Sequence, residues 1–193
     1  MKKNKDILVI PKHKLPFDNG LTIDESDLWI KYNVHMLFRD VTADSKLFYR
    51  IIPYLIIECN GHYLVFNTGD GRYSFNNGLS YITDSIFYYE PIKNIIQVNA
   101  TKRGIKDLSV IKDYGFIKST RDNPDDIAIV YKAKLKELYD APDNAKWMTY
   151  HELIDKCRKF DSFGIEYIDY LVSRRLKNKE WFNGFFCKST RTG

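Results

Sequence analysis

The feature that most constrains the fold is a long apolar segment, followed directly by a turn signal and a second apolar segment. Residues 48–59 (FYRIIPYLIIEC) are rich in Ile and Tyr, and residues 62–66 (HYLVF) follow the dipeptide Asn60-Gly61. Asn-Gly suits a two-residue hairpin turn, because both positions of that turn adopt a positive φ. A continuous apolar run is typical of a strand that is buried on both faces of its sheet. The sequence therefore predicts a buried β-hairpin over residues 48–66.

The rest of the chain predicts further strands and three helices. Pro91 begins the first helix, its apolar residues recur every three or four positions up to Ala100, and Gly104 ends it. Thr149 caps the second helix, over residues 150–158, and Glu152 completes a capping box. The third helix spans residues 164–176. We expect strands over residues 6–10, 108–117, 127–134 and 147–148, which gives an α+β plan with a sheet between helices.

The positive charge of the chain is concentrated at its C-terminal end. The chain has 193 residues and a net charge of +5, and residues 174–193 hold six Lys and Arg against one acidic residue. Such an end attracts phosphates or is simply a solvated helix end. The four aromatic residues at positions 181, 182, 185 and 186 indicate packing on the domain or on a partner. We expect a single domain over residues 1–176 and a basic, aromatic tail over residues 177–193.

Cysteine usage and apolar run lengths predict a cytoplasmic protein. The three cysteines are an odd number without metal-ligand spacing, which indicates reduced thiols. The apolar run near the N-terminus is about four residues long, too short for a signal peptide or an anchor. No later stretch approaches the ~20 apolar residues of a spanning helix, so we expect no membrane association. Aromatic residues make up 15% of the chain and either fill a core or form a stacking surface for bases.

Several motifs occur in the same order in one known family. They are the opening strand DILVIPK, the hairpin and loop YRIIPYLIIECNGHYLVFNTGDGRYSFNNGLSYI, the strands in DYGFIKSTRDNPDDIAIVYKAKL, and WMTYHELID. Over residues 6–171 this order resembles the Nudix hydrolase superfamily, in particular its branch of predicted phosphoesterases. That branch carries Y-S-x-G-x-G-G-H-x-N ahead of its catalytic motif, where this chain has YSFNNGLSYI. The resemblance implies an α+β fold, a Nudix-like α/β/α sandwich with a mixed β-sheet.

The defining motif of that family is the Nudix box, G-x5-E-x7-R-E-U-x-E-E-x-G-U, where U is an aliphatic residue. Its glutamates share one helix face, because residues at i, i+3 and i+4 are neighbours on a helix surface. In the family they bind Mg²⁺ or Mn²⁺, cations that prefer oxygen ligands. The metals activate water and stabilise the charge that develops on a pyrophosphate. The family's reaction therefore depends on this group of carboxylates.

The end of the box fits this chain at Gly104-Ile105, but the fit contains no glutamate. Gln97 falls at the arginine position, and Val98, Thr101 and Lys102 fall at the three glutamate positions. Lys102 places a cation where the family binds a divalent metal. The resemblance therefore implies a degenerate Nudix box and a pseudoenzyme that retains the helix and its terminal glycine.

The first half of the box fits less closely. Gly78 matches the box glycine and Asp84 stands at the first glutamate, although the stretch from Gly78 to Gly104 is about five residues longer than the pattern. Asp84 and Glu90 are the weak candidates for catalysis, as a pair that holds one metal. We favour the alternative that they are N-terminal helix caps, which the helix dipole stabilises. The spacing of His and Cys residues predicts no metal site.

Five side chains are candidates for binding a phosphate-bearing ligand. Arg72 and Asn76 belong to a turn-rich loop whose backbone N–H groups cradle a phosphate or form a plain turn. Lys102 and Arg103 lie at the face where the metal would bind, and they either replace it as static counter-charges or reflect drift after loss of function. Arg121 lies in a loop whose counterpart borders the ligand pocket in the resembled family.

Three hypotheses about function remain open at this point. The first is a catalytically inactive Nudix-fold protein that binds a nucleotide or another phosphate-bearing ligand and needs no cofactor. The second is an active hydrolase of nucleoside-diphosphate compounds that uses Mg²⁺ or Mn²⁺. The third is an interaction protein that holds a protein partner through its basic, aromatic tail. The first and third rank above the second, and nucleic acid stays open as a partner although no nucleic-acid motif supports it.

Overall fold

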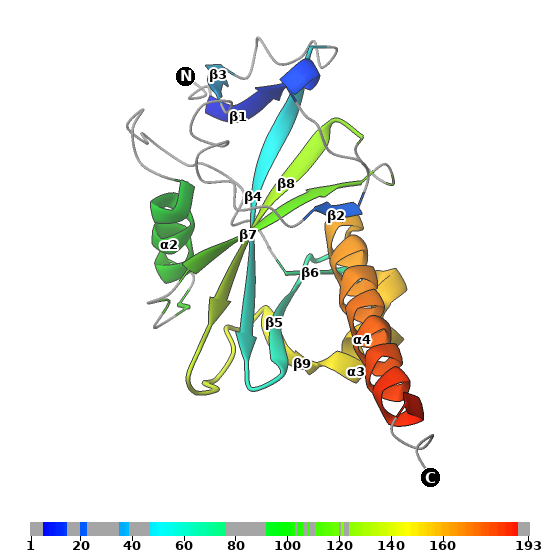
Figure 1. Cartoon of the computed structure of the whole chain (residues 1–193). Coiled ribbons are helices and arrows are strands. Elements are labelled where there is room, and N and C mark those ends of the chain that lie inside the picture. Colours follow the sequence, from blue (N-terminus) through cyan, green and yellow to red (C-terminus); the bar gives the residue numbers. More distant parts are fainter. Residues whose placement is uncertain are drawn as a thin grey trace.

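The computed structural model describes residues 6–14, 20–22, 35–38, 47–75, 92–102, 104–105, 108, 111–119, 121 and 124–188 (Figure 1). In chain order, the elements are β1 (Asp6–Pro11), the 3-10 turn η1 (Lys12–Lys14), β2 (Gly20–Thr22), β3 (His35–Phe38), β4 (Phe48–Cys59), β5 (His62–Asn67), β6 (Tyr73–Ser74), α2 (Ile92–Lys102), β7 (Ile111–Lys118), β8 (Asp126–Lys134), β9 (Ala145–Thr149), α3 (Tyr150–Asp155), the 3-10 turn η3 (Cys157–Lys159) and α4 (Ser162–Lys188).

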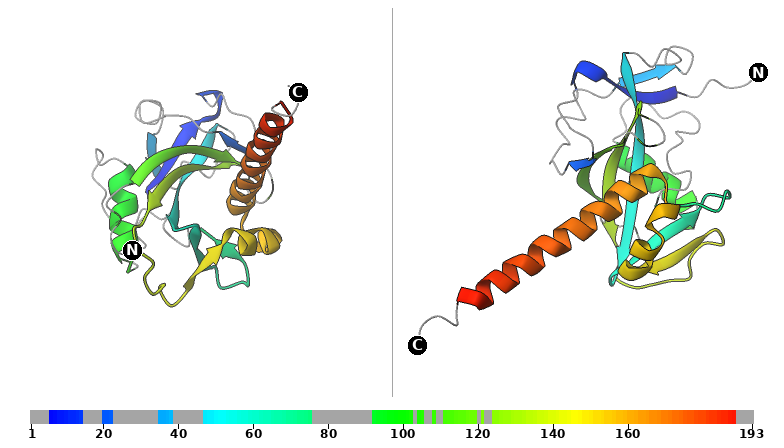
Figure 2. Two further views of the ribbon diagram at one scale, coloured as in Figure 1. Left: turned by 60° about the horizontal axis from the view of Figure 1, so that its bottom comes forward. Right: turned by 90° about the vertical axis from the view of Figure 1, so that its right-hand side faces the viewer.

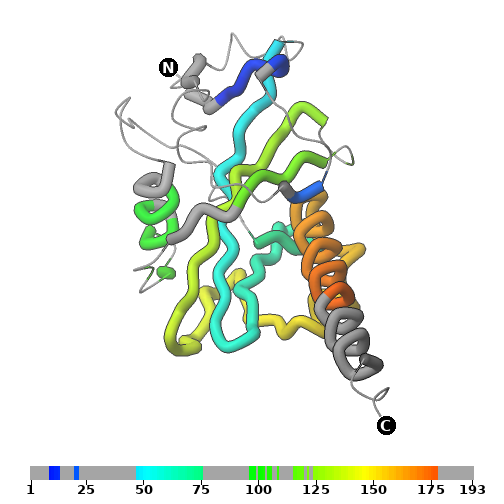
Figure 3. Tube along the Cα trace, in the orientation of Figure 1, coloured from blue at the N-terminus to red at the C-terminus, as the bar shows by residue number. Residues whose placement is uncertain are grey.

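The predicted hairpin is confirmed, and its first strand organises the sheet. Asn60 and Gly61 have φ values of 48° and 77°, as a two-residue hairpin turn requires. β4 pairs in parallel with β8 along most of its length, and antiparallel with β1 at its start and with β5 at its end. Figure 3 shows β4 crossing the molecule from one end to the other. The mixed sheet has the order β2-β7-β8-β4-β1-β3, and β5 carries β6 and β9 away from this path.

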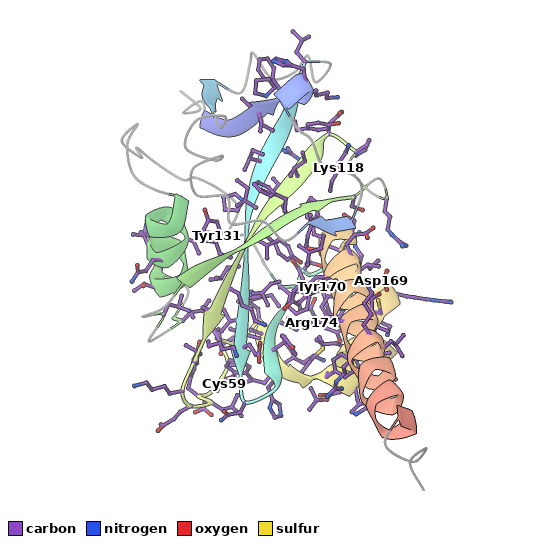
Figure 4. The ribbon with its side chains drawn as sticks, in the orientation of Figure 1. Cys59, Lys118, Tyr131, Asp169, Tyr170 and Arg174 are labelled. Carbon is purple, nitrogen blue, oxygen red and sulfur yellow. The ribbon has the colours of Figure 1, made fainter. Side chains whose placement is uncertain are left out.

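The sheet is buried on both faces, and each face has its own core (Figure 2). Successive side chains of a strand point to opposite faces, so β4, β5, β7, β8 and β9 contribute to both cores. Figure 4 shows Tyr131 on the side of α2 and Tyr170 on α4. The α2-side core includes Leu55, Ile57, Leu64, Phe66, Ile96, Ala100, Ile127 and Ile129. The α4-side core includes Tyr54, Ile56, Tyr63, Val65, Phe75, Val130, Phe163 and Tyr167.

The helix α2 forms as its periodicity predicts. Ile96 and Ala100 are fully buried against the sheet. The N–H of Ile105 donates to the carbonyl oxygen of Ala100 at 3.1 Å, and the N–H of Gly104 donates to that of Thr101 at 3.0 Å. These two bonds form a Schellman motif, which needs a left-handed residue after the helix, and Gly104 has a φ of 75°. Gly104 therefore ends α2, as predicted.

The second helix starts as predicted and ends earlier. Thr149 and Glu152 form the capping box, with the Thr149 N–H donating to Glu152 Oε2 at 2.8 Å. α3 stops at Asp155 instead of residue 158, and η3 follows. The helix ends early because Phe160 forms a parallel bridge with Tyr73, and the backbone must turn before residue 160 to reach it.

Several other elements differ from the prediction: β9 spans Ala145–Thr149 instead of residues 147–148, and β2 and β3 were not predicted. β7 begins at Ile111 rather than residue 108, because Ile111 pairs with Ala133 and β8 ends one residue later. β6 was not predicted, since its two residues gain their strand geometry from pairing with β5 and from the bridge between Tyr73 and Phe160. α4 begins at Ser162 and continues to Lys188, past the expected end at residue 176. No helix in the described ranges, α4 included, is long and apolar enough to span a bilayer.

A buried hydrogen-bond network ties the start of α4 to the sheet. The Tyr54 hydroxyl donates to Asp161 Oδ1 at 3.0 Å and accepts from the Phe75 N–H at 3.4 Å. The Gly164 N–H donates to the same Asp161 oxygen at 2.7 Å, so Asp161 caps α4. A Cβ at Gly164 would lie 2.9 Å from that oxygen, which explains glycine here. Burial, followed by the charge of Asp161, raises the pKa of Tyr54 well above its ordinary value, so the phenol stays protonated as a donor.

Candidate functional site

The outer face of α2 is the first part of the candidate site, because the box fit places the metal ligands there. Val98, Thr101 and Lys102 share one face by their i, i+3 and i+4 spacing, and all three are exposed, Val98 by 50%. The Thr101 hydroxyl donates to the carbonyl oxygen of Gln97 at 3.0 Å. Lys102 lies in the last turn of α2, where a cation is favoured by the helix dipole. This face offers a hydroxyl, an apolar side chain and one cation, and it carries no carboxylate.

The loop of residues 67–73 is closed by its own hydrogen bonds. Asp70 accepts from the Thr68 hydroxyl, from the Arg72 N–H at 3.1 Å and from Arg72 Nε at 2.8 Å. The Gly69 N–H donates to Asn67 Oδ1 at 2.9 Å. The Thr68 hydroxyl, followed by Arg72, holds the pKa of Asp70 far below its usual range. The Asp70 carboxylate thus occupies the centre of the turn, the position in which an anion cradle would hold a phosphate.

Arg121 lies against α4. Its Nε is 3.4 Å from Glu166 Oε1, its Nη2 is 4.0 Å from Asp169 Oδ2, and its N–H donates to Ser119 Oγ at 3.3 Å. Figure 4 shows Asp169 on α4. Lys102 lies on α2, which covers the opposite face of the sheet. The structure therefore places these two candidate cations on different faces, and it places Arg72 in the loop between β5 and β6.

The remaining candidates lie outside the described residues. These are Asn76, Asp84, Glu90 and Arg103, together with the box glycine Gly78. Among the residues that are described, no group of three or more His, Cys, Asp or Glu side chains is placed to hold a metal ion. Cys59 and Cys157 are free cysteines.

Neither a protein-family model nor a curated protein sequence matches the chain. Among solved structures, the crystal structure of "Tm1382, a putative Nudix hydrolase" superimposes with a TM-score of 0.60, and the match covers 88% of this chain and 99% of that one. The fold is Nudix-like. The two sequences are 13% identical, so the likeness concerns the fold alone.

Within this Nudix-like fold, α2 is the helix whose end the box pattern fits. The helix, the left-handed Gly104 and the buried Ile105 are all present. A carboxylate-free helix face cannot supply the oxygen ligands that Mg²⁺ and Mn²⁺ prefer. It can supply a fixed positive charge through Lys102, because that ammonium group is exposed to a ligand in solution.

Proposed function

We propose that this chain is a Nudix-fold protein that binds a phosphate-bearing small molecule, such as a nucleotide, without hydrolysing it. The observation that carries the proposal is the exposed face of α2, with Val98, Thr101 and Lys102 at the positions that the box fit assigns to metal ligands. The family's reaction needs a metal that activates the attacking water and stabilises the charge that develops on a pyrophosphate. Without a bound metal, neither happens.

Lys102 supports the binding half of the proposal. An ammonium group is a compact cation with three N–H donors, and it binds phosphate oxygens as a point charge. It does not lower the pKa of a water molecule as a divalent metal does. A lysine at this position therefore favours retention of a phosphate group over its transfer to water.

A thermal-shift series with nucleotides, with and without Mn²⁺, tests this function. We expect a nucleotide to raise the Tm, and the rise should grow with the logarithm of the nucleotide concentration above Kd, with no effect of Mn²⁺ and no product in the same samples. Lys102→Gln should reduce the shift, whereas Lys136→Gln, at an exposed lysine between β8 and β9, should not. Release of a phosphate product that depends on Mn²⁺ and disappears in Asp84→Ala or Glu90→Ala would establish the hydrolase alternative instead.

Restoring the carboxylates tests the assignment of the box to α2. The variant Val98→Glu/Thr101→Glu/Lys102→Glu changes three exposed side chains, so the fold should tolerate it. If α2 is the box helix, the variant should gain binding of Mn²⁺, measured by calorimetry. The matched control carries Gln at the same three positions and should gain none. Equal behaviour of the two variants would show that the box does not map onto this helix.

The interaction hypothesis is favoured by one further observation on α4. Phe163, Tyr167 and Ile168 pack into the α4-side core, whereas residues 173–177 are all exposed, including Leu176 at 55%. A second copy of the chain is the first partner to test, by sedimentation of the full chain and of a chain ending at Leu176. Association of the full chain alone would support the interaction function. A ligand-induced Tm shift that survives the truncation would support the binding function.

A further inference from the structure

A pocket of about 430 Å³ lies between β5, β6 and β9. Val65 and Tyr73 line it, and both side chains belong to the α4-side core. The lining contains none of the α2 residues discussed above, so the pocket is separate from the site proposed there. Its polar lining includes Asn67, Asn144, Asp143 and Lys146 as well as the Tyr73 hydroxyl.

Two donor groups meet in this pocket because β5 holds their strands in register. Tyr73 pairs with Asn67 of β5, and Lys146 pairs with Val65 on the other edge of the same strand. Lys146 Nζ donates to the Tyr73 hydroxyl at 3.1 Å and lies 4.6 Å from the centroid of its ring. Both groups are thus positioned before any ligand arrives.

The start of α4 fixes the tyrosine from the other side. The Tyr73 carbonyl oxygen accepts from the Asp161 N–H at 2.9 Å, and its ring packs on Phe160 with centroids 5.7 Å apart. Asp161 is itself held by Tyr54 in the buried network. A rigid donor loses little conformational freedom on binding, which favours affinity for a small ligand.

Three lysines act on the Tyr73 hydroxyl. The hydrogen bond from Lys146, followed by the charges of Lys146, Lys156 and Lys159, lowers the pKa of Tyr73 from its ordinary value. Lys156 Nζ is 4.0 Å from Glu152, which offsets part of its charge. Asp143 is the acidic side chain in the lining. A field that stabilises a phenolate also stabilises a ligand anion at the same point.

We propose that this pocket binds a phosphoryl dianion, as inorganic phosphate or as a small phosphate monoester, through Lys146 Nζ and the Tyr73 hydroxyl. The hydroxyl accepts from Lys146, so its own hydrogen is available to donate to the anion. Hydrogen bonds from charged donors to phosphate oxygens are among the strongest in proteins. The volume lies within the ~300–1,000 Å³ of small-molecule sites, so it accommodates an organic group beside the phosphate.

The test is an amide NMR titration of the full chain with inorganic phosphate and, separately, with methyl phosphate at constant ionic strength. We expect saturable shifts in residues 67–73 and 143–146. Lys146→Gln should weaken binding by about tenfold or more, and Tyr73→Phe by a smaller factor. Asp143→Asn should strengthen binding by about threefold, because it removes a like charge from the lining. Lys136→Gln, an exposed lysine outside the pocket, is the matched control.

The outcomes separate the two sources of the dianion and can overturn the site. Tighter binding of phosphate identifies the free ion as the ligand, and tighter binding of methyl phosphate identifies an ester. Absence of shifts at tens of millimolar, or equal loss in Lys146→Gln and Lys136→Gln, would eliminate the pocket as an anion site. Neither result affects the function proposed for α2. That function is tested by the nucleotide-induced rise in Tm and its loss in the Lys102 variant.

Discussion

The two faces of the sheet are covered in different ways. The described contacts of α2 are apolar: Ile96 and Ala100 insert into a core that is largely aliphatic on the strands. On the other face, α4 meets an aromatic core and is also held by the hydrogen bonds of Tyr54, Asp161 and Gly164. Apolar packing depends on volume and is not directional, whereas hydrogen bonds fix position and angle.

This difference bears on which residues of the two helices can be substituted without loss of the fold. Among the α2 side chains that the structure describes, Ile96 and Ala100 are buried against the sheet, whereas residues 98, 101 and 102 are exposed and can change without loss of packing. The start of α4 has no comparable freedom, because its capping carboxylate, its glycine and a strand tyrosine all depend on one another. Substitutions on the outer side of α2 should therefore disturb the fold less than substitutions at the start of α4.

The largest expected effect concerns the buried side of α2. Ile96→Ala should lower the free energy of unfolding by about 3 kcal/mol, because it removes a fully buried side chain and leaves a cavity. Val98→Ala, two residues away on the exposed side, should change it by less than ~0.5 kcal/mol. Urea denaturation measures both. Similar costs at the two positions would mean that the inner and outer sides of α2 are not distinct.

A smaller effect is expected from the hydroxyl that joins β4 to α4. Tyr54→Phe should lower the free energy of unfolding by about 1–3 kcal/mol, because it leaves buried hydrogen-bond partners of Tyr54 unsatisfied. Tyr49→Phe is the matched control on the α2 side, where the half-buried ring packs against the aliphatic core. That change should cost under ~0.5 kcal/mol. Equal costs of the two variants in urea denaturation would show that the hydrogen bonds of Tyr54 add no stability on the α4 side.

The smallest effect is the pH dependence of the α3 cap. The Thr149 N–H, followed by its hydroxyl, lowers the pKa of Glu152 from the ordinary 4.5. Its charge therefore stabilises the folded chain above pH 4.5, and this contribution is lost as the pH falls through the lowered pKa. Glu152→Gln should cost about 0.5 kcal/mol at neutral pH, since this partly exposed carboxylate is screened, and nothing in strong acid. A difference in Tm that persists unchanged in acid would show that the charge is not involved.

The sequence was sufficient wherever the signal lies within a few residues. The Asn60-Gly61 turn, the capping box of Thr149 and Glu152, and the glycine that ends α2 all appear in the structure as predicted. Each depends on local backbone preference and on periodicity, which a segment carries with it. The Nudix-like fold was implied by the resemblance of several ordered motifs to one family, and the structural comparison supports it.

Tertiary structure alone decided which distant side chains meet. Tyr73 and Lys146 are 73 positions apart, and they touch because β6 and β9 pair with the two edges of β5. The Asp70 carboxylate binds Arg72 within a loop that the sequence left open as a phosphate cradle or a plain turn, and Arg121 contacts Glu166 of α4. Such contacts depend on strand register and helix placement, which arise from the packing of the whole chain and leave no signature in a short segment.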